Sequence, residues 1–430
     1  MKLRQNKLVP LVLEDRPGIG PVASWSGAIG TDFERHIDRL EKIRQDWVGQ
    51  DSGDDLPNVC LRLPQRLLEE YSQQRTQSRL GEVFLQANRY QSHTDRVIFL
   101  GSNHAHSTIK WFMDACCDPH WNELHRGERG SKPRVYFLGH STDNDKSQGL
   151  LQLFSPLRPS NRAEAMGWGV IALESSDESL AQTFTQDHIR QYLKSSGFES
   201  FFYQCPTLSS FGLHPQSNIL SSFLAFSEIG MLPAAVLGIN IMELLSGAAY
   251  ASRLFVSTSA HQNPILRWVA WKLSTPTLNM ALWNQSLISG CHWLSHLGNP
   301  QGEAEATPSV QWNCVTPLSH RFADWTLDSC NHLWVENPRF DPLPLCPVQA
   351  DTMVWDPSSD RPRLLSPCSP SGPTTIDSTR DLFEHTLERQ SNQGGLGLTI
   401  RFHDLGELSL GQWMQWMIIA SILEAWVLDT

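Results

Sequence analysis

Three short apolar runs, each followed by a helix-like stretch, constrain the fold of this chain more than any other feature. The runs cover residues 96–101 (RVIFLG), 134–139 (RVYFLG) and 168–176 (WGVIALESS). Strands that are apolar throughout are covered on both faces, and their alternation with helices is typical of parallel sheets with right-handed crossovers. The sequence therefore predicts an α/β protein with doubly wound parallel sheets. Helices are expected over residues 107–118, 145–154 and 177–193.

The rest of the chain contains helical segments with a few isolated strands. Pro233 and Gly238 are expected to interrupt the strongly apolar helical region 223–245. Five prolines predict an irregular loop over 357–378. Further helices are expected over 31–47, 65–88 (one or two), 263–273, 278–297 and 410–427, and strands over 330–335, 352–355 and 396–402.

Length and composition limit the class of protein. The 430 residues correspond to two or three domains at about 150 residues each. A net charge of −11, without a block of Lys or Arg, argues against a nucleic-acid partner. Nine scattered cysteines with no Cys-x-x-Cys pair fit a reducing cytoplasm. No run reaches the ~18 apolar residues of a membrane span, so a cytoplasmic protein is expected. Sixteen tryptophans favour aromatic core packing or aromatic-rich pockets.

Polar loops follow each of the three strand-like runs, at the edge where doubly wound sheets bind ligands. The loop 174–179 carries Glu174, Asp177 and Glu178, which oppose a phosphate and favour a helix cap instead. His104, His106 and His140 could meet as a metal or acid–base cluster, or they could simply face solvent. His292 and His296 have zinc-like spacing but lack a His-Glu-x-x-His pattern. No metal site and no cofactor are therefore assigned.

Residues 226–248 (FSEIGMLPAAVLGINIMELLSGA) resemble the long helix motif of the phosphoglucose isomerase (glucose-6-phosphate isomerase) family. Residues 96–118, 140–154, 263–273 and 396–423 resemble further parts of that family, while 298–390 match poorly. The resemblance implies two sugar-isomerase (SIS) domains, at 91–250 and, in degenerate form, at 260–403. A helical N-terminal segment (1–90) and a closing helix (404–430) would complete the chain. It also implies a small sugar-phosphate ligand and a homodimer.

Family members interconvert an aldose and a ketose phosphate with a glutamate, an arginine, a histidine and a Ser/Thr-rich phosphate loop. Carried over by position, the family's turn falls on Gly101, Ser102 and Asn103, and its phosphate loop on 174–179, where Ser176 and Ser179 remain. The arginine falls on Ser222 and the glutamate on Gly290. The ring-opening histidine corresponds to His320, and a closing lysine motif would lie beyond Thr430. The resemblance thus implies His320 as catalytic residue and Gly101, Ser102, Ser176, Ser179 and Ser222 as substrate-binding positions.

These replacements predict a pseudoenzyme, a binding or structural paralogue of the isomerase. An alternative is a divergent but active enzyme that interconverts glucose 6-phosphate and fructose 6-phosphate in glycolysis and gluconeogenesis, with His320, His104 or Glu174 in substitute roles. A third possibility is an ordinary isomerase whose glutamate lies at another position than Gly290.

Overall fold

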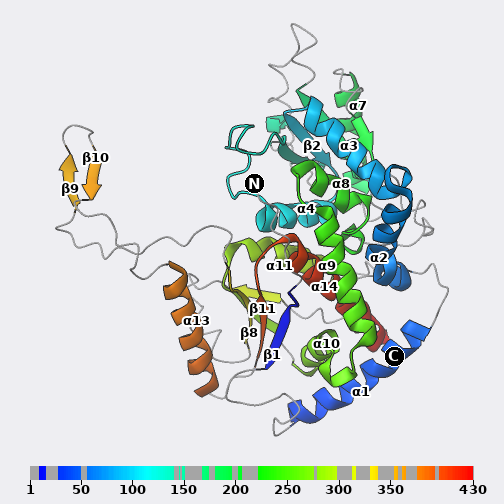
Figure 1. Ribbon diagram of the computed structural model, residues 1–430, viewed down its shortest axis with the longest axis vertical. Helices are drawn as coiled ribbons and strands as arrows, with labels where there is room; N and C mark the ends of the chain where they lie inside the picture. Colours follow the sequence, from blue (N-terminus) through cyan, green and yellow to red (C-terminus); the bar gives the residue numbers. More distant parts are fainter. Residues whose placement is uncertain are drawn as a thin grey trace.

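The computed structural model contains two sheets of mainly parallel strands with helices packed around and between them (Figure 1). The residues that the structure describes are 9–15, 28–49, 56–139, 145, 148–150, 167–173, 180–195, 202–205, 221–275, 278–297, 312–315, 330–337, 353–356, 361–364, 375–392 and 397–429.

The first sheet is entirely parallel and has the strand order β3-β2-β4-β5. Its middle strands are buried because apolar residues fill both faces: residues 97–100 and 168–172 are all buried. The predicted doubly wound parallel arrangement is confirmed, and the three predicted strands are present. The strands are β2 (Arg96–Leu100), β3 (Arg134–Leu138), β4 (Trp168–Ala172) and β5 (Phe202–Gln204).

The second sheet has the order β1-β11-β8-β6-β7 and repeats the connectivity of the first. When β1 is left out, both sheets follow one pattern: the earliest strand in the chain pairs with the second on one side and with the third on the other, and the fourth lies beyond the third. Only β1 is antiparallel, and Glu14 at this edge pairs with Arg401 of β11. The strands are β1 (Val12–Asp15), β6 (Leu278–Leu282), β7 (Trp312–Val315), β8 (Cys330–Val335) and β11 (Leu398–Phe402).

Several expected elements differ from those observed. A single helix over 278–297 is wrong, because its first five residues form β6, which pairs with strands on both sides. Pro233 does not interrupt α8 (Glu228–Leu237), whereas Gly238 ends it. The loop expected over 357–378 contains β10 (Arg361–Leu364), which pairs with β9 (Met353–Asp356), and the start of α13 (Thr375–Asn392). The helix expected over 145–154 lies mostly outside the described residues.

The remaining helices follow the sequence pattern more closely. The region 65–88 contains parts of two helices, and the helix after β2 begins four residues earlier than expected because Ser102 caps it. The helices are α1 (Ala28–Gly49), α2 (Leu56–Gln74), α3 (Arg79–His93), α4 (Asn103–Cys116), α7 (Leu180–Ser195), α9 (Ile241–Ser257), α10 (Pro264–Ser274), α11 (Ile288–Leu297) and α14 (Glu407–Asp429), with short 3-10 turns η2 (Arg75–Gln77), η6 (Ser221–Leu224), η7 (Ala260–Gln262) and η8 (Gln285–Leu287).

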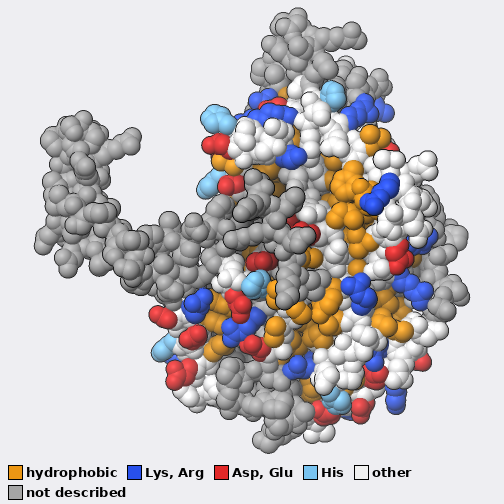
Figure 2. All heavy atoms as spheres, viewed as in Figure 1, with side chains coloured by type: hydrophobic (Ala, Val, Ile, Leu, Met, Phe, Trp, Pro, Cys, Tyr) orange, Lys and Arg blue, Asp and Glu red, His pale blue; other side chains and the backbone are white. Residues whose placement is uncertain are grey.

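The C-terminal helix α14 is the centre of the hydrophobic core. Residues 409–420 are buried without interruption, as expected for a helix surrounded by protein. Helices α1, α2, α9, α10 and α11 all contact it. Within the described part of the chain, no helix has the length and apolar character needed to cross a membrane. On the face drawn in Figure 2, acidic and basic side chains are interspersed.

Helices α9 and α14 touch through their backbones. A Cβ atom at Gly247 of α9 would lie 2.1 Å from the Leu408 carbonyl oxygen, and one at Gly411 of α14 would lie 2.0 Å from the Leu244 carbonyl oxygen. Neither carbonyl oxygen can move away without moving its helix. The two glycines therefore set the distance between these helices.

Polar side chains of α14 make hydrogen bonds or an ion pair with four other segments. Gln412 accepts a hydrogen bond from the Leu11 amide and donates one to the Val9 carbonyl. Gln415 donates to the Cys60 carbonyl of α2 and to the Ser252 hydroxyl of α9, each at 2.9 Å. A buried ion pair links Glu424 to Lys272 of α10. Because buried polar groups are costly when unpaired, these bonds favour one position of α14 among the alternatives.

Replacing Gly411 with Ala should lower the free energy of unfolding by about 3 kcal/mol or more, since overpacking forces the backbone to shift. Helix propensity alone would favour Ala over Gly by about 1 kcal/mol, so the expected change has the opposite sign to the change that propensity predicts. Urea denaturation followed by circular dichroism measures the effect. Gly49→Ala is the matched control, because a Cβ at Gly49 meets no atom within 4 Å. Equal stabilities of the two variants would contradict the backbone contact.

Candidate functional site

The topology places the switch point of the first sheet at the carboxyl ends of β2 and β4. The chain leaves β2 toward β3 on one side and returns to β4 on the other, which is the point where open α/β sheets bind ligands. A Cβ at Gly101 would lie 3.1 Å from the Leu173 Cβ. The turn after β2 and the residue after β4 are thus in contact at this edge.

The turn after β2 leads directly into α4. Ser102 is buried and caps the helix, with its hydroxyl accepting a hydrogen bond from the Ala105 amide at 3.4 Å. The N-terminal end of α4 therefore lies at this switch point, and the dipole of a helix favours an anion at its N-terminal end. Gly101 and Ser102, two predicted substrate-binding positions, both lie here.

His104 and His106, which the sequence analysis considered with His140 as a metal or acid–base cluster, lie in different environments, and His140 lies outside the described residues. His106 is fully buried, and its Nε2 donates a hydrogen bond to the Phe99 carbonyl at 3.1 Å. Its ring also packs edge-on against Phe137, so it contacts the sheet beneath the turn. His104 is half-buried on the first turn of α4, and burial lowers its pKa below the usual 6.5. Among the described residues, no group of three or more His, Cys, Asp or Glu could hold a metal ion.

Two other positions singled out in the sequence lie near α4. Ser222 belongs to η6, which contacts both α4 and α11, and Gly290 belongs to α11, which packs on α4. Ser176, Ser179 and His320 lie outside the described residues, as do His140 and Glu174. The structure therefore brings Gly101, Ser102, Ser222 and Gly290 onto elements in mutual contact.

Trp111 occupies the space beside Gly290. A Cβ at Gly290 would lie 2.7 Å from Cε2 and 2.9 Å from Nε1 of this indole. Trp293, also on α11, packs against Trp111 with ring centroids 5.0 Å apart. A side chain at position 290 would have to displace the Trp111 ring.

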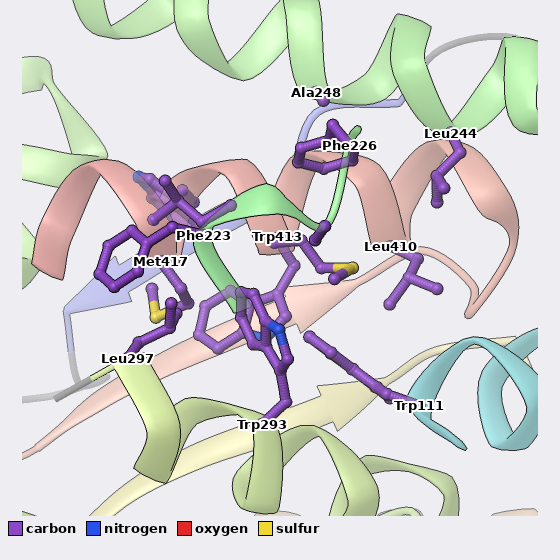
Figure 3. Close-up of a cluster of buried hydrophobic side chains, with 14 of the residues drawn as sticks. Trp111, Phe223, Phe226, Leu244, Ala248, Trp293, Leu297, Leu410, Trp413 and Met417 are labelled. Atoms are coloured by element: carbon purple, nitrogen blue, oxygen red, sulfur yellow. The ribbon is translucent and has the colours of Figure 1, made fainter. Parts of the chain in front are cut away.

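A cluster of aromatic and aliphatic side chains surrounds this contact, between the two halves of the molecule. Figure 1 shows α4 and α11 between β2 of the first sheet and β8 and β11 of the second. In the close-up, side chains from α4, η6, α9, α11 and α14 converge there (Figure 3). The members are Trp111, Phe223, Phe226, Leu244, Ala248, Trp293, Leu297, Leu410, Trp413 and Met417, all buried.

The sequence analysis did not single out Trp111. The only indication in the sequence was the high number of tryptophans, which fits a packed core as well as an aromatic pocket. The position of Trp111, eight residues into the helix that follows β2, could be read from the sequence. Its contact with Gly290, 179 positions later, could not.

Comparisons with known proteins support the fold. No family model matches the chain. It is 21% identical over 196 residues to the glucose-6-phosphate isomerase of Caldanaerobacter subterraneus subsp. tengcongensis, which covers 41% of each protein. The chain thus spans about two fifths of that relative's length.

Two solved structures resemble most of the chain. A hypothetical protein from Thermus thermophilus superposes with a TM-score of 0.68 at 15% identity, over 98% of this chain and 95% of that one. A glucose-6-phosphate isomerase from Chlamydia trachomatis gives a TM-score of 0.54 at 13% identity, over 80% of this chain and 68% of that one. The protein has a sugar-phosphate-isomerase-like fold.

Replacing Gly290 with Ala should destabilise the protein by about 1–3 kcal/mol, because the new methyl group meets the Trp111 ring in a filled core. The measurement is urea denaturation. In a Trp111→Leu background the same replacement should lower the free energy of unfolding by clearly less. The smaller leucine leaves space for the new methyl group, so the effects of the two neighbouring substitutions are not additive. An equal cost in both backgrounds would show that Trp111 does not fill the space beside Gly290.

The lowered pKa of His104 predicts acid sensitivity. As the pH falls below 6.5, the unfolded chain takes up a proton at His104 before the folded chain does. The free energy of unfolding therefore decreases as the pH is lowered. The fall is at most about 1.4 kcal/mol per pH unit for one proton. Urea denaturation at pH 7.5 and 5.5 should show a smaller loss for His104→Gln than for the wild type. His120→Gln, at an exposed position, should behave like the wild type.

Proposed function

We propose that this protein is a catalytically impaired relative of phosphoglucose isomerase whose remaining role is to bind a small sugar phosphate. The observation that carries the proposal is the packing of Trp111 against Gly290, at the position where the family resemblance places a catalytic glutamate. An indole fills the space that a carboxylate would need. Ser222 stands where the resemblance places the arginine.

The lack of a glutamate and an arginine at the expected positions argues against turnover at ordinary enzyme rates. A proton-transfer reaction at carbon needs a positioned base and a fixed donor for the developing oxyanion. Removing one oxyanion donor costs about 3–4 kcal/mol of transition-state stabilisation, and removing the general base costs a further factor of about 10²–10⁴ in rate. A chain that lacks both groups at these positions is expected to lose most of the rate.

Binding depends on features that remain in place. The Ser102-capped end of α4 lies at the point where the strand order reverses, and a helix N-terminus favours an anion. The resemblance in sequence and in fold is to proteins named as glucose-6-phosphate isomerases. The net charge of −11 means that attraction for a phosphate would have to come from such local groups.

Ligand binding and turnover should separate in two measurements. At 100 times its dissociation constant, fructose 6-phosphate should add about 2.7 kcal/mol of stability, which raises the Tm by about 3 °C for a chain of this size. In a coupled assay, the same protein should not interconvert glucose 6-phosphate and fructose 6-phosphate. Fructose and inorganic phosphate, each added alone, are the controls and should give smaller shifts.

Two outcomes would overturn the proposal. Turnover at ordinary enzyme rates would favour the active isomerase, and its loss in His320→Ala would assign His320 the substitute catalytic role. Absence of both turnover and a Tm shift with fructose 6-phosphate or glucose 6-phosphate would favour a purely structural paralogue.

A further inference from the structure

Helix α13 covers the outer face of the second sheet through a small apolar cluster of its own. Figure 1 shows this helix on the side of the sheet that faces away from α14. Side chains alternate along β8, so that Leu333 and Val335 enter the main core while Cys330 and Trp334 face α13. The cluster is separate from the main core and consists of Ala281, Trp283, Cys330, Trp334, Phe383 and Leu387.

His332 of β8 lies fully buried beneath α13, and both of its ring nitrogens take part in hydrogen bonds. Its Nδ1 accepts from the Trp283 indole at 3.1 Å, and its Nε2 donates to the Oε1 of Gln390 on α13 at 2.9 Å. Gln390 in turn donates to the Cys330 carbonyl at 3.3 Å. Because an indole N–H can only donate, Nδ1 must carry a lone pair, and the ring must be neutral in this arrangement.

Protonation of His332 is incompatible with this bonding. A proton on Nδ1 would point at the Trp283 N–H, so that two donors would face each other and the hydrogen bond would be lost. The neighbours of His332 in the sheet, Ala281 and Thr399, are uncharged. Burying the charged ring there would add a desolvation cost. Docking of α13 and protonation of His332 therefore oppose each other.

The acids described on the surrounding elements are already paired or face solvent. Glu14 of β1 pairs with Arg401 of β11, and Glu336 at the end of β8 lies 3.8 Å from the His403 ring. Arg401 is a cation on the strand next to β8, and like charges repel a protonated ring. The charged or titratable side chains of α13 from residue 380 onward lie on its exposed face: Arg380, Asp381, Glu384, His385, Glu388 and Arg389.

His106 is also fully buried, but its surroundings differ. Its hydrogen bond to the Phe99 carbonyl joins α4 to β2, and Ala105 beside it belongs to the main core. Displacing His106 would therefore disrupt that core, whereas α13 is held by few side chains. Its buried side chains, among those that the structure describes, are Phe383, Thr386, Leu387 and Gln390.

We infer that His332 is a pH-sensitive latch, which holds α13 on the second sheet while the ring is neutral and releases the helix when the ring is protonated. Release uncovers the apolar face formed by Trp283, Cys330 and Trp334 and leaves the main core in place. The latch is independent of the proposed sugar-phosphate binding, because it acts on the opposite side of the second sheet from α14.

Hydrogen–deuterium exchange of peptides from α13, corrected for the intrinsic rate at each pH, tests the latch. A released imidazole with a pKa of about 6.5 takes up its proton between pH 7.5 and 5.5, so the protection of α13 should fall about 10-fold. Peptides from α14 should stay better protected than α13 at both pH values. Equal protection of the two helices at pH 5.5 would show unfolding of the whole chain and contradict a local release.

Three variants separate the latch from a general effect of acid. In His332→Asn the side-chain oxygen can still accept from the Trp283 indole but cannot titrate, so the protection of α13 should change less than 2-fold with pH. His385→Gln, on the exposed face of the same helix, is the matched control and should respond like the wild type. In Gln390→Glu the carboxylate would pair with a protonated ring, so acid should increase the protection of α13. A wild-type response in His332→Asn would overturn the inference.

The wild-type protein gives an independent measurement, which does not depend on any variant docking α13. In ¹⁵N NMR of the histidine rings, the His332 signal is the one missing from His332→Asn. It should show the neutral ring protonated at Nε2 at pH 7.5, and the docked population should keep this form at pH 5.5. A charged His332 ring in protein whose α13 is still protected would show that protonation does not release the helix.

Discussion

The backbone contact between α9 and α14 is the constraint on which the rest of the structure depends. Because Gly247 and Gly411 lack side chains, the two helices approach until the carbonyl oxygens of Leu408 and Leu244 occupy the space beside them. This approach positions α14 in the middle of the molecule, in contact with α11 and α10 of the second half and with α2 and α9. The two sheets are therefore held together through one buried helix, with polar bonds from Gln415 and Glu424 selecting its position.

The central position of α14 also determines which side chains meet between the two sheets. The region between the sheets receives Trp413 from α14, Trp293 from α11 and Trp111 from α4, and these three fully buried indoles form part of a packed hydrophobic core (Figure 3). Indoles can recognise the shape and the hydroxyl groups of a ligand, but they cannot take a proton from carbon. The absence of a general base among these indoles agrees with the serine and glycine found at the positions that the family resemblance assigns to charged groups.

Several ionisable or strongly polar groups in the interior serve the fold instead of a reaction. His106 donates to the Phe99 carbonyl beneath the turn that starts α4. His332 accepts from the Trp283 indole and donates through Nε2 to Gln390 of α13, so both of its ring nitrogens are used. Lys272 pairs with Glu424 between α10 and α14. Since each of these groups already has a partner that would have to be given up, none is available as a general acid or base in the arrangement described.

The sequence alone determined the elements whose pattern is local. Residues 96–100, 134–138 and 168–172 are apolar runs with turns after them, so they could be predicted as buried strands, and the parallel sheet followed from their alternation with helices. Ser102 was available as a helix cap, yet the shift of α4 toward it was missed because capping decides a boundary that periodicity leaves open. Residues 278–282 fit either a strand or a helix, and only pairing with β7 and β8 decided between them. The place of α14 at the centre, the contact of Trp111 with Gly290 and the packing of the His106 ring against Phe137 were decided by the tertiary structure. These features depend on segments far apart in the chain, and their contacts have no periodic trace in the sequence.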